Sequence, residues 1–296
     1  MNSRNKEKGD KKVKIDIQQS WWAMNGLGND NREWTMEEKF EKIAEAGFTG
    51  IMGELPEEHD MDKWRRLLDE YQFSFGIHSF PSKREDLQQL LTKAKEFGVQ
   101  YVSSQVMDDF IIGEEAVQLL KSLVDEAKKV NIPYFVETHR GRITQDLIRT
   151  VNYVKEISDL RLTVDLSHYV VAGEGCHSKK AEECFDILLK RTSSIHARVS
   201  NGHQIQIDIG SDGNHPMTER FVKWWEKGMS YWLQEANQGD VLPLVCELGP
   251  PDYSITKHTS IDTIEISDRW EQAIVFKRIL EEAWGRVVQS HSSVTR

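Results

Sequence analysis

An apolar segment leads directly into a charged cluster in the stretch Pro133-Tyr134-Phe135-Val136-Glu137-Thr138-His139-Arg140-Gly141-Arg142. Residues 134–137 are typical of a short buried strand. An acid, an imidazole and two guanidinium groups follow within the next few positions. A strand that ends in such a cluster brings several charged groups to one point. The stretch therefore predicts a strand whose C-terminal end contributes to a polar site.

Short apolar segments alternate with amphipathic segments along the rest of the chain. Strands are predicted at residues 17–25, 50–54, 73–79, 100–106, 134–137, 162–166, 194–199 and 242–248. Helices are predicted at residues 35–46, 60–71, 82–97, 114–130, 144–157, 178–190, 218–237 and 268–284. Thr35-x-x-Glu38 and Ser82-x-x-Glu85 have the spacing of capping boxes. Eight strand–helix units with parallel pairing predict an α/β fold, a single (β/α)8 TIM barrel.

The two ends of the chain differ from this pattern. Residues 1–14 are polar and basic with no apolar run behind them, so we expect a loose tail rather than a signal peptide. We place the barrel at residues 15–286 and a second loose tail at 287–296. A total of 296 residues is ordinary for one barrel of this kind.

Composition argues against several classes of function. The formal net charge is −10, which is poorly suited to binding a polyanion such as DNA. No apolar run is long enough to span a membrane. The three cysteines have no CxxC spacing, which predicts reduced thiols in a cytoplasmic protein. Nothing in the sequence specifies the oligomeric state, so a homo-oligomer is possible.

Four polar residues stand at the ends of the fifth to eighth predicted strands: Glu137, Asp165, His196 and Glu247. These strands are neighbours in a barrel, so their C-terminal ends meet at one side of the mouth. Three carboxylates and one imidazole form a hard ligand set, which suits one divalent ion. We expect Mn²⁺ first, with Mg²⁺, Co²⁺ or Zn²⁺ as alternatives. Without a cation the carboxylates would repel one another.

Basic residues near these ligands are candidates for binding substrate charge. Arg198 follows His196 by two positions and therefore points to the same face of its strand. It can neutralise charge that develops on a substrate, or pair with a ligand carboxylate. His139 and Arg140 open the loop after the fifth strand, where a guanidinium can bind a carboxylate or phosphate. The alternative is a solvated loop that caps the next helix.

Other strand ends supply weaker candidates. Glu54 and His78 end the second and third strands, and Gln105 lies at the end of the fourth. Each is a candidate for binding substrate hydroxyls at the barrel mouth. Trp21 and Trp22 lie near the first strand, where core or rim packing is favoured over stacking on a sugar.

The sequence resembles a known superfamily at four segments: Phe135–His139, Val164–His168, Ile195–Arg198 and Val245–Leu248. They look like the motifs of the xylose-isomerase-like sugar phosphate isomerase/epimerase superfamily. The resemblance implies that Glu137, Asp165, His196 and Glu247 hold one divalent cation. It also implies that Glu137 and Glu247 act as an acid/base pair, and that His168 contacts a substrate oxygen.

These features together predict a metal-dependent isomerase or epimerase that acts on a keto-sugar, or a related polyhydroxy carbonyl compound, through an enediolate. The alternative is a metal-dependent lyase or dehydratase acting on a keto-sugar or inosose. Two further hypotheses are a non-catalytic sugar binder and an apurinic endonuclease. The net charge argues against the endonuclease, as does the lack of a histidine on the fourth strand. Whether the substrate is phosphorylated stays open.

Overall fold

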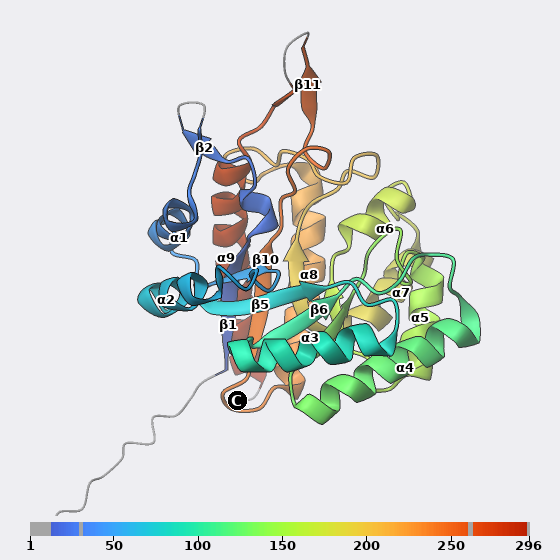
Figure 1. The fold of residues 1–296 in the computed structure, drawn as a ribbon. Coiled ribbons are helices and arrows are strands. Elements are labelled where there is room, and N and C mark those ends of the chain that lie inside the picture. The colour runs from blue at the N-terminus through green and yellow to red at the C-terminus, as the bar shows by residue number, and fades with distance from the viewer. Residues whose placement is uncertain (1–12, 30–31, 260–262, 295–296) are drawn as a thin grey trace, which may run out of the picture.

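The barrel predicted from the sequence is present in the computed structural model, which describes residues 13–29, 32–259 and 263–294. Eight parallel strands close in the order β1-β10-β9-β8-β7-β6-β5-β4 (Figure 1). Their bounds are β1 Lys14–Ser20, β4 Gly50–Gly53, β5 Ser74–Ser79, β6 Tyr101–Ser104, β7 Tyr134–Glu137, β8 Leu162–Val164, β9 Thr192–Ala197 and β10 Val241–Cys246. The pairing of β1 with both β10 and β4 closes the cylinder.

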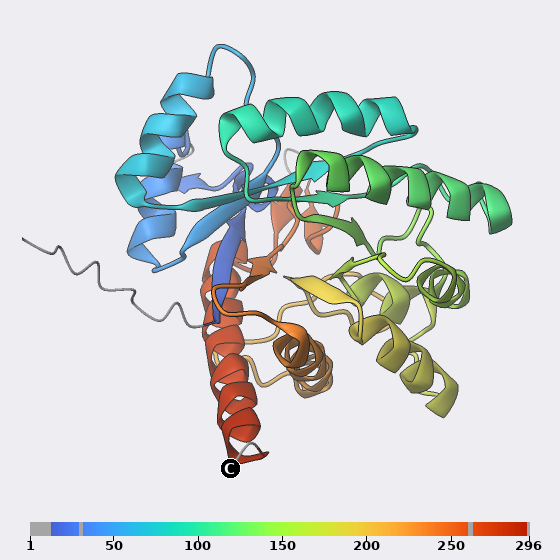
Figure 2. The same cartoon turned by 90° about the horizontal axis from the view of Figure 1, so that it is seen from below.

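Helices surround the strands on the outside, as Figure 2 shows from below. The long ones are α1 Met36–Glu45, α2 Met61–Tyr71, α3 Arg84–Phe97, α4 Gly113–Val130, α5 Leu147–Glu156, α7 Lys179–Leu189, α8 Pro216–Glu235 and α9 Arg269–Val294. A short helix, α6 (Ser167–Ala172), follows β8. No helix in the described ranges has the length and apolar character needed to cross a membrane.

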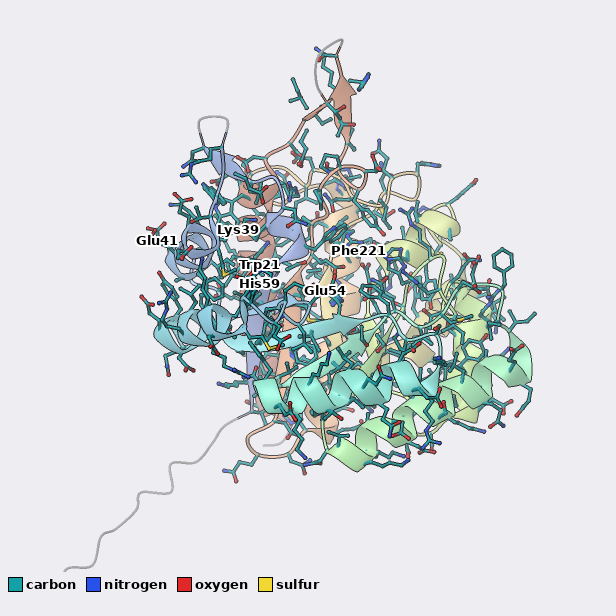
Figure 3. All side chains as sticks on the ribbon, viewed as in Figure 1. Trp21, Lys39, Glu41, Glu54, His59 and Phe221 are labelled. Atoms are coloured by element: carbon teal, nitrogen blue, oxygen red, sulfur yellow. The ribbon has the colours of Figure 1, made fainter. Side chains whose placement is uncertain are left out.

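The core lies between the helices and the outer faces of the strands. Near α1, Trp21 packs edge-on against Trp64 and also contacts Phe40, and the Lys39 amine lies 5.4 Å from the Trp21 ring centre (Figure 3). On α8, the tryptophans at 224, 225 and 232 are buried. The three cysteines are unpaired, as expected.

Several predicted boundaries are wrong. The first strand ends at Ser20 and a 3-10 helix, η1 (Trp22–Met24), follows, so Asn25 is not a strand end. The Thr35 capping box is confirmed. At α3, however, the acid that caps the preceding backbone is Asp86 and not Glu85, because the Asp86 carboxylate accepts from the Ser82 and Lys83 amides.

The structure also differs from the prediction at the C-terminal end of the chain and at two hairpins. Helix α9 continues to Val294 instead of ending at 284, so residues expected in a loose tail are helical. The predicted N-terminal tail lies almost entirely outside the described residues. The hairpins β2–β3 (Gly28–Asn29, Arg32–Glu33) and β11–β12 (Thr256–His258, Thr263–Glu265) were not predicted. They follow β1 and β10 in the chain and project from one end of the barrel (Figure 1).

Candidate metal centre

The four predicted ligands converge at the C-terminal ends of neighbouring strands. Glu137 is the last residue of β7, Asp165 follows β8, His196 lies in β9 and Glu247 follows β10. One potential ligand atom from each lies within 4.8 Å of the others. All four side chains are buried. The four side chains converge because consecutive strands of a closed parallel barrel end on the same rim.

Glu137 and Glu247 lie between two histidines. On one side, His196 Nδ1 is 3.1 Å from Glu247 Oε2 and 3.6 Å from Glu137 Oε1. On the other side, His78 Nε2 is 3.3 Å from Glu247 Oε1, and its Nδ1 is 3.8 Å from Glu137 Oε2. Each carboxylate therefore turns one oxygen toward each imidazole. His78, predicted as a contact for substrate hydroxyls, lies against both carboxylates.

Arg198 is buried beneath the same cluster. Its Nη2 donates to Glu247 Oε2 at 2.6 Å, its Nε donates to the Glu247 carbonyl at 2.8 Å, and its Nη1 is 3.3 Å from Asp165 Oδ2. Of the two roles considered from the sequence, the ion pair with ligand carboxylates is therefore present. Gln105 also contacts a ligand, because its amide donates to the Glu137 carboxylate at 3.2 and 3.3 Å.

Electrostatics in this cluster follow from burial and close charges. Burial lowers the pKa of the His196 imidazolium, but the carboxylates of Glu247 and Glu137 outweigh it and raise the pKa to about 10. Burial raises the pKa of Asp165 to about 6, against the opposing effect of Arg198. Burial also favours the neutral form of Glu247, but His196 and Arg198 hold its pKa well below the ordinary value. Without a metal, the His196 proton thus offsets part of the carboxylate charge.

A divalent cation fits this donor set. Within the described chain, Asp165 Oδ2 is contacted by Arg198 at 3.3 Å but accepts no hydrogen bond, so it has lone pairs free for a cation. Three carboxylates carry a charge of −3 and Arg198 carries +1. A divalent ion beside a neutral His196 brings this sum to zero. The residues present can therefore hold such an ion without leaving a net buried charge.

A cavity of about 300 Å³ opens beside the cluster. Its lining consists of Trp22, Glu54, His78, Phe80, Gln105, His139, Arg142, Arg198, Glu247 and Tyr253. Most residues predicted for substrate contact thus border one space. Glu54, labelled in Figure 3, follows β4 and is exposed at the rim. Arg140 is not part of the lining, and its guanidinium lies over the Tyr253 ring at 5.2 Å.

Two further histidines lie beside Glu137. His139 and His168 have ring centres 3.9 Å apart, and burial lowers the pKa of both below the ordinary value, so both are neutral. His139 Nδ1 donates to the Arg140 carbonyl at 2.5 Å, which leaves its Nε2 to accept from the Tyr253 hydroxyl at 3.2 Å. His168 Nε2 is 3.6 Å from Asp165 Oδ2. Glu137, His139 and His168 form a second group able to hold a metal ion.

Tyr253, Trp22 and Phe80 are site residues that the sequence reasoning did not identify as such. Tyr253 lies edge-on to Trp22, with ring centres 5.0 Å apart. The two rings meet over Gly249, where a Cβ would lie 2.3 Å from the Trp22 ring and 2.6 Å from Tyr253 Cβ. In the sequence, the available signal for Tyr253 was a glycine, Gly249, followed by an aromatic residue in the loop directly after Glu247.

Comparison with known proteins agrees with this architecture. The family described as the xylose isomerase-like TIM barrel matches residues 40–224, which is more than half of the chain. The chain therefore belongs to that family. A sequence search against curated proteins found no significant match.

Solved structures with the same fold are distant in sequence. A D-allulose 3-epimerase from Methylomonas sp. in complex with D-allulose has 13% identity and a TM-score of 0.61, covering 91% of this chain and 97% of its own. A xylose isomerase-like TIM barrel protein from Mycobacterium smegmatis in complex with magnesium has 12% identity and a TM-score of 0.59, with coverages of 92% and 98%. The probable 3-DHS dehydratase AsbF from Bacillus anthracis has 11% identity and a TM-score of 0.57, with coverages of 89% and 98%. At these identities the similarity establishes the fold.

Proposed function

We propose that this protein is a divalent-metal-dependent isomerase or epimerase that acts on a keto-sugar, or a related polyhydroxy carbonyl compound, through an enediolate. One observation carries the proposal. Glu137 and Glu247 face one point from β7 and β10, each with one oxygen toward His196 and the other toward His78. Two carboxylates that flank one point are what removal of a proton on one face and its return on the other require.

The chain's own residues divide the work in this proposal. One of Glu137 and Glu247 takes the proton from the carbon beside the carbonyl, and the other returns a proton. Return to the same carbon from the opposite face gives an epimer, and return to the neighbouring carbon gives an isomer. His78 contacts both carboxylates and so orients the pair. Such positioned groups contribute about 10²–10⁴-fold to the rate.

The proposed reaction also uses a divalent metal ion. Glu137, Asp165, His196 and Glu247 would hold it, and it would supply Lewis-acid stabilisation of negative charge on the substrate oxygens. Mn²⁺ is the proposed ion because oxygen-rich sites with one imidazole suit it. Arg198 keeps Glu247 and Asp165 ionised as ligands, since it contacts both carboxylates.

A dehydratase is the second candidate, and one observation favours it. Beside Glu137, the buried imidazole of His168 has an Nδ1 atom without a hydrogen-bond partner among the described residues, and this atom can share a hydrogen bond with a substrate hydroxyl. If the hydroxyl held there lies on the carbon next to the one that loses its proton, it is the group that a dehydratase expels. The same proton abstraction then ends in loss of water.

The test combines metal analysis with solvent exchange. The purified protein is analysed for bound metal and is then incubated in D₂O with Mn²⁺ and a panel of ketoses, keto-acids and inososes. Deuterium entering one carbon, with recovery of a stereoisomer or an aldose–ketose pair, is the expected result. A dehydrated product would support the second candidate instead.

Glu247→Gln is the matched variant because it keeps the shape of the side chain and removes its basicity. We expect it to lose exchange by about 10²-fold or more while the barrel stays folded. Exchange at the wild-type rate in this variant would refute the assignment of Glu247. Exchange by no member of the panel in the metal-loaded wild type would refute the proposed function.

A further inference from the structure

Arg142 presents to the cavity a guanidinium that has no carboxylate partner among the described residues. It lines the cavity beside Phe80, and its guanidinium carbon lies 5.5 Å from the centre of that ring. Its Nη1 donates a hydrogen bond to the Met107 carbonyl at 3.3 Å. No ion pair joins it to a carboxylate among the residues that the structure describes. An Arg side chain is always charged, so this cation faces the space that the substrate would occupy.

Arg140 adds a second positive charge on the same loop. It lies over Tyr253, and it too has no carboxylate partner within the described ranges. Arg198 differs, because Asp165 and Glu247 already compensate its charge. Its guanidinium also lies against Tyr253, at 4.9 Å from the ring centre.

The charges around the cavity do not cancel. With a divalent ion bound, the charges of the three candidate ligand carboxylates, Arg198 and the ion sum to zero. Arg140 and Arg142 then contribute +2 and the exposed Glu54 contributes −1. The site keeps a net positive charge, and its positive side is the loop after β7. A neutral sugar would leave both guanidinium groups without an anion.

The neighbouring helix ends favour a carboxylate over a phosphate. Phosphate sites in proteins commonly use free backbone N–H groups at a helix N-terminus. The N-terminus of α5, which follows this loop, is capped by Asp146, whose side chain accepts from the Arg149 amide at 2.8 Å. The backbone before α3 is likewise taken by Asp86, which also borders the adjoining cavity. What remains is a planar guanidinium fork, which can pair with a carboxylate without help from backbone N–H groups.

We infer that the substrate is a sugar acid: a polyhydroxy carbonyl compound whose carboxylate binds Arg142, with Arg140 adding to the local positive charge. The inference rests on the proposed function, because it assumes that the metal and the Glu137/Glu247 pair meet the carbonyl end of the substrate. Glu54, an exposed acid in the cavity lining, is left for hydroxyl groups.

The test uses ligands that differ at one carbon. D-fructuronate and D-tagaturonate carry a carboxylate at C6, the parent ketoses carry a hydroxyl there, and the ketose 6-phosphates carry a phosphate. Binding of each to the full-length Mn²⁺-loaded protein is measured by titration calorimetry. We expect at least one uronate to bind about tenfold or more tighter than its neutral parent, as a charge-assisted hydrogen-bond pair provides.

Variants assign the preference to Arg142. Arg142→Gln should weaken binding of the uronate about 10- to 100-fold and change binding of the neutral ketose by less than about twofold. Arg142→Lys should fall between the two because it keeps the charge but loses the planar fork. Arg278→Gln is the matched control, since Arg278 lies exposed on α9 and pairs with Glu282. It should bind every ligand as the wild type does.

The outcomes separate this inference from the proposed function. The inference is overturned if no uronate is preferred over its parent ketose, if a 6-phosphate is preferred over its uronate, or if the preference survives in Arg142→Gln. Deuterium exchange is measured on the same ligands. A uronate preference that depends on Arg142 without any exchange supports the anion site and refutes the isomerase proposal. Deuterium exchange of a uronate and of its parent ketose at equal rates, unchanged in Arg142→Gln, supports the isomerase proposal and overturns the anion site.

Discussion

Replacing Arg198 with methionine tests the charge balance of the candidate metal centre directly. Arg198 is 1% exposed, and its guanidinium contacts both Asp165 and Glu247. Methionine has a similar length but no charge and no donors. The variant therefore leaves two buried carboxylates without their cationic partner and the Glu247 carbonyl without its donor.

The expected cost follows from the behaviour of buried ion pairs. Removing one partner of such a pair lowers the free energy of unfolding by about 3–5 kcal/mol. The entropy of unfolding is about 2.1 cal/mol/K per residue, which for a chain of 296 residues is about 0.6 kcal/mol/K. The midpoint of thermal unfolding of the metal-free variant should therefore lie about 5–8 °C below that of the wild type. The deficit should narrow at saturating Mn²⁺, because the cation then compensates the same carboxylates.

Thermal unfolding is followed by circular dichroism and by calorimetry, with EDTA and with Mn²⁺. Arg198→Lys keeps the positive charge but cannot contact Asp165, the Glu247 carboxylate and the Glu247 carbonyl at once. Its unfolding midpoint should therefore fall between those of wild type and Arg198→Met. Arg191→Met is the matched control, because the Arg191 guanidinium donates to the backbone carbonyls of Ser158 and Val154 and to no carboxylate among the residues that the structure describes. This control should lower the unfolding midpoint by less than half as much as Arg198→Met does.

Two results would refute this reasoning. An unfolding midpoint of Arg198→Met within about 1 °C of the wild type in EDTA would mean that the carboxylates do not depend on Arg198. A deficit that widens when Mn²⁺ is added would mean that the ion and the guanidinium do not share the same carboxylates.

Three further predictions concern the metal, the imidazole ligand and the barrel interior. Removing the metal with EDTA should lower the unfolding midpoint by about 4 °C relative to protein at 100 times the dissociation constant of Mn²⁺, and an unchanged midpoint would count against a native site. Because the pKa of His196 is raised to about 10 in the metal-free protein, the imidazole must lose a proton to bind the ion. Mn²⁺ affinity should thus rise about tenfold per pH unit between pH 7 and 9, measured by calorimetry in two buffers, and a flat profile would contradict the raised pKa. Gly76→Ala should lower the unfolding midpoint by about 2–5 °C, because the new Cβ would lie 2.3 Å from the Tyr101 ring, whereas Gly98→Ala, with open space around it, tests the backbone effect alone.

The barrel and the convergence of the four candidate ligands were predictable because each depends on local pattern and on one rule of topology. The segment 134–137 is apolar up to Glu137, and it forms β7 with the predicted bounds. Asp165, His196 and Glu247 stand at equivalent places after later apolar segments. In a parallel barrel all such places lie on one rim, so sequence order alone brings the four side chains together.

Contacts across the barrel could not be predicted in the same way. His78 comes from β5, and nothing in its own segment indicates that it lies against Glu137 and Glu247 rather than in the open mouth. Arg198 had two possible roles from its spacing, and only the position of its guanidinium relative to Asp165 separates them. These contacts depend on side-chain directions across a closed sheet, which local pattern does not encode.

By itself, therefore, the amino-acid sequence determined the eightfold alternation of strands and helices and the residue types that each strand presents at its C-terminal end. Only the tertiary structure decided which charges are compensated and which are not. Arg198 is paired because it points inward beneath the carboxylates, and Arg142 has no carboxylate partner among the described residues because its loop turns it toward the cavity. The physical reason is that the Coulomb energy of a charge depends on its distance from other charges and on its burial, and the folded chain sets both.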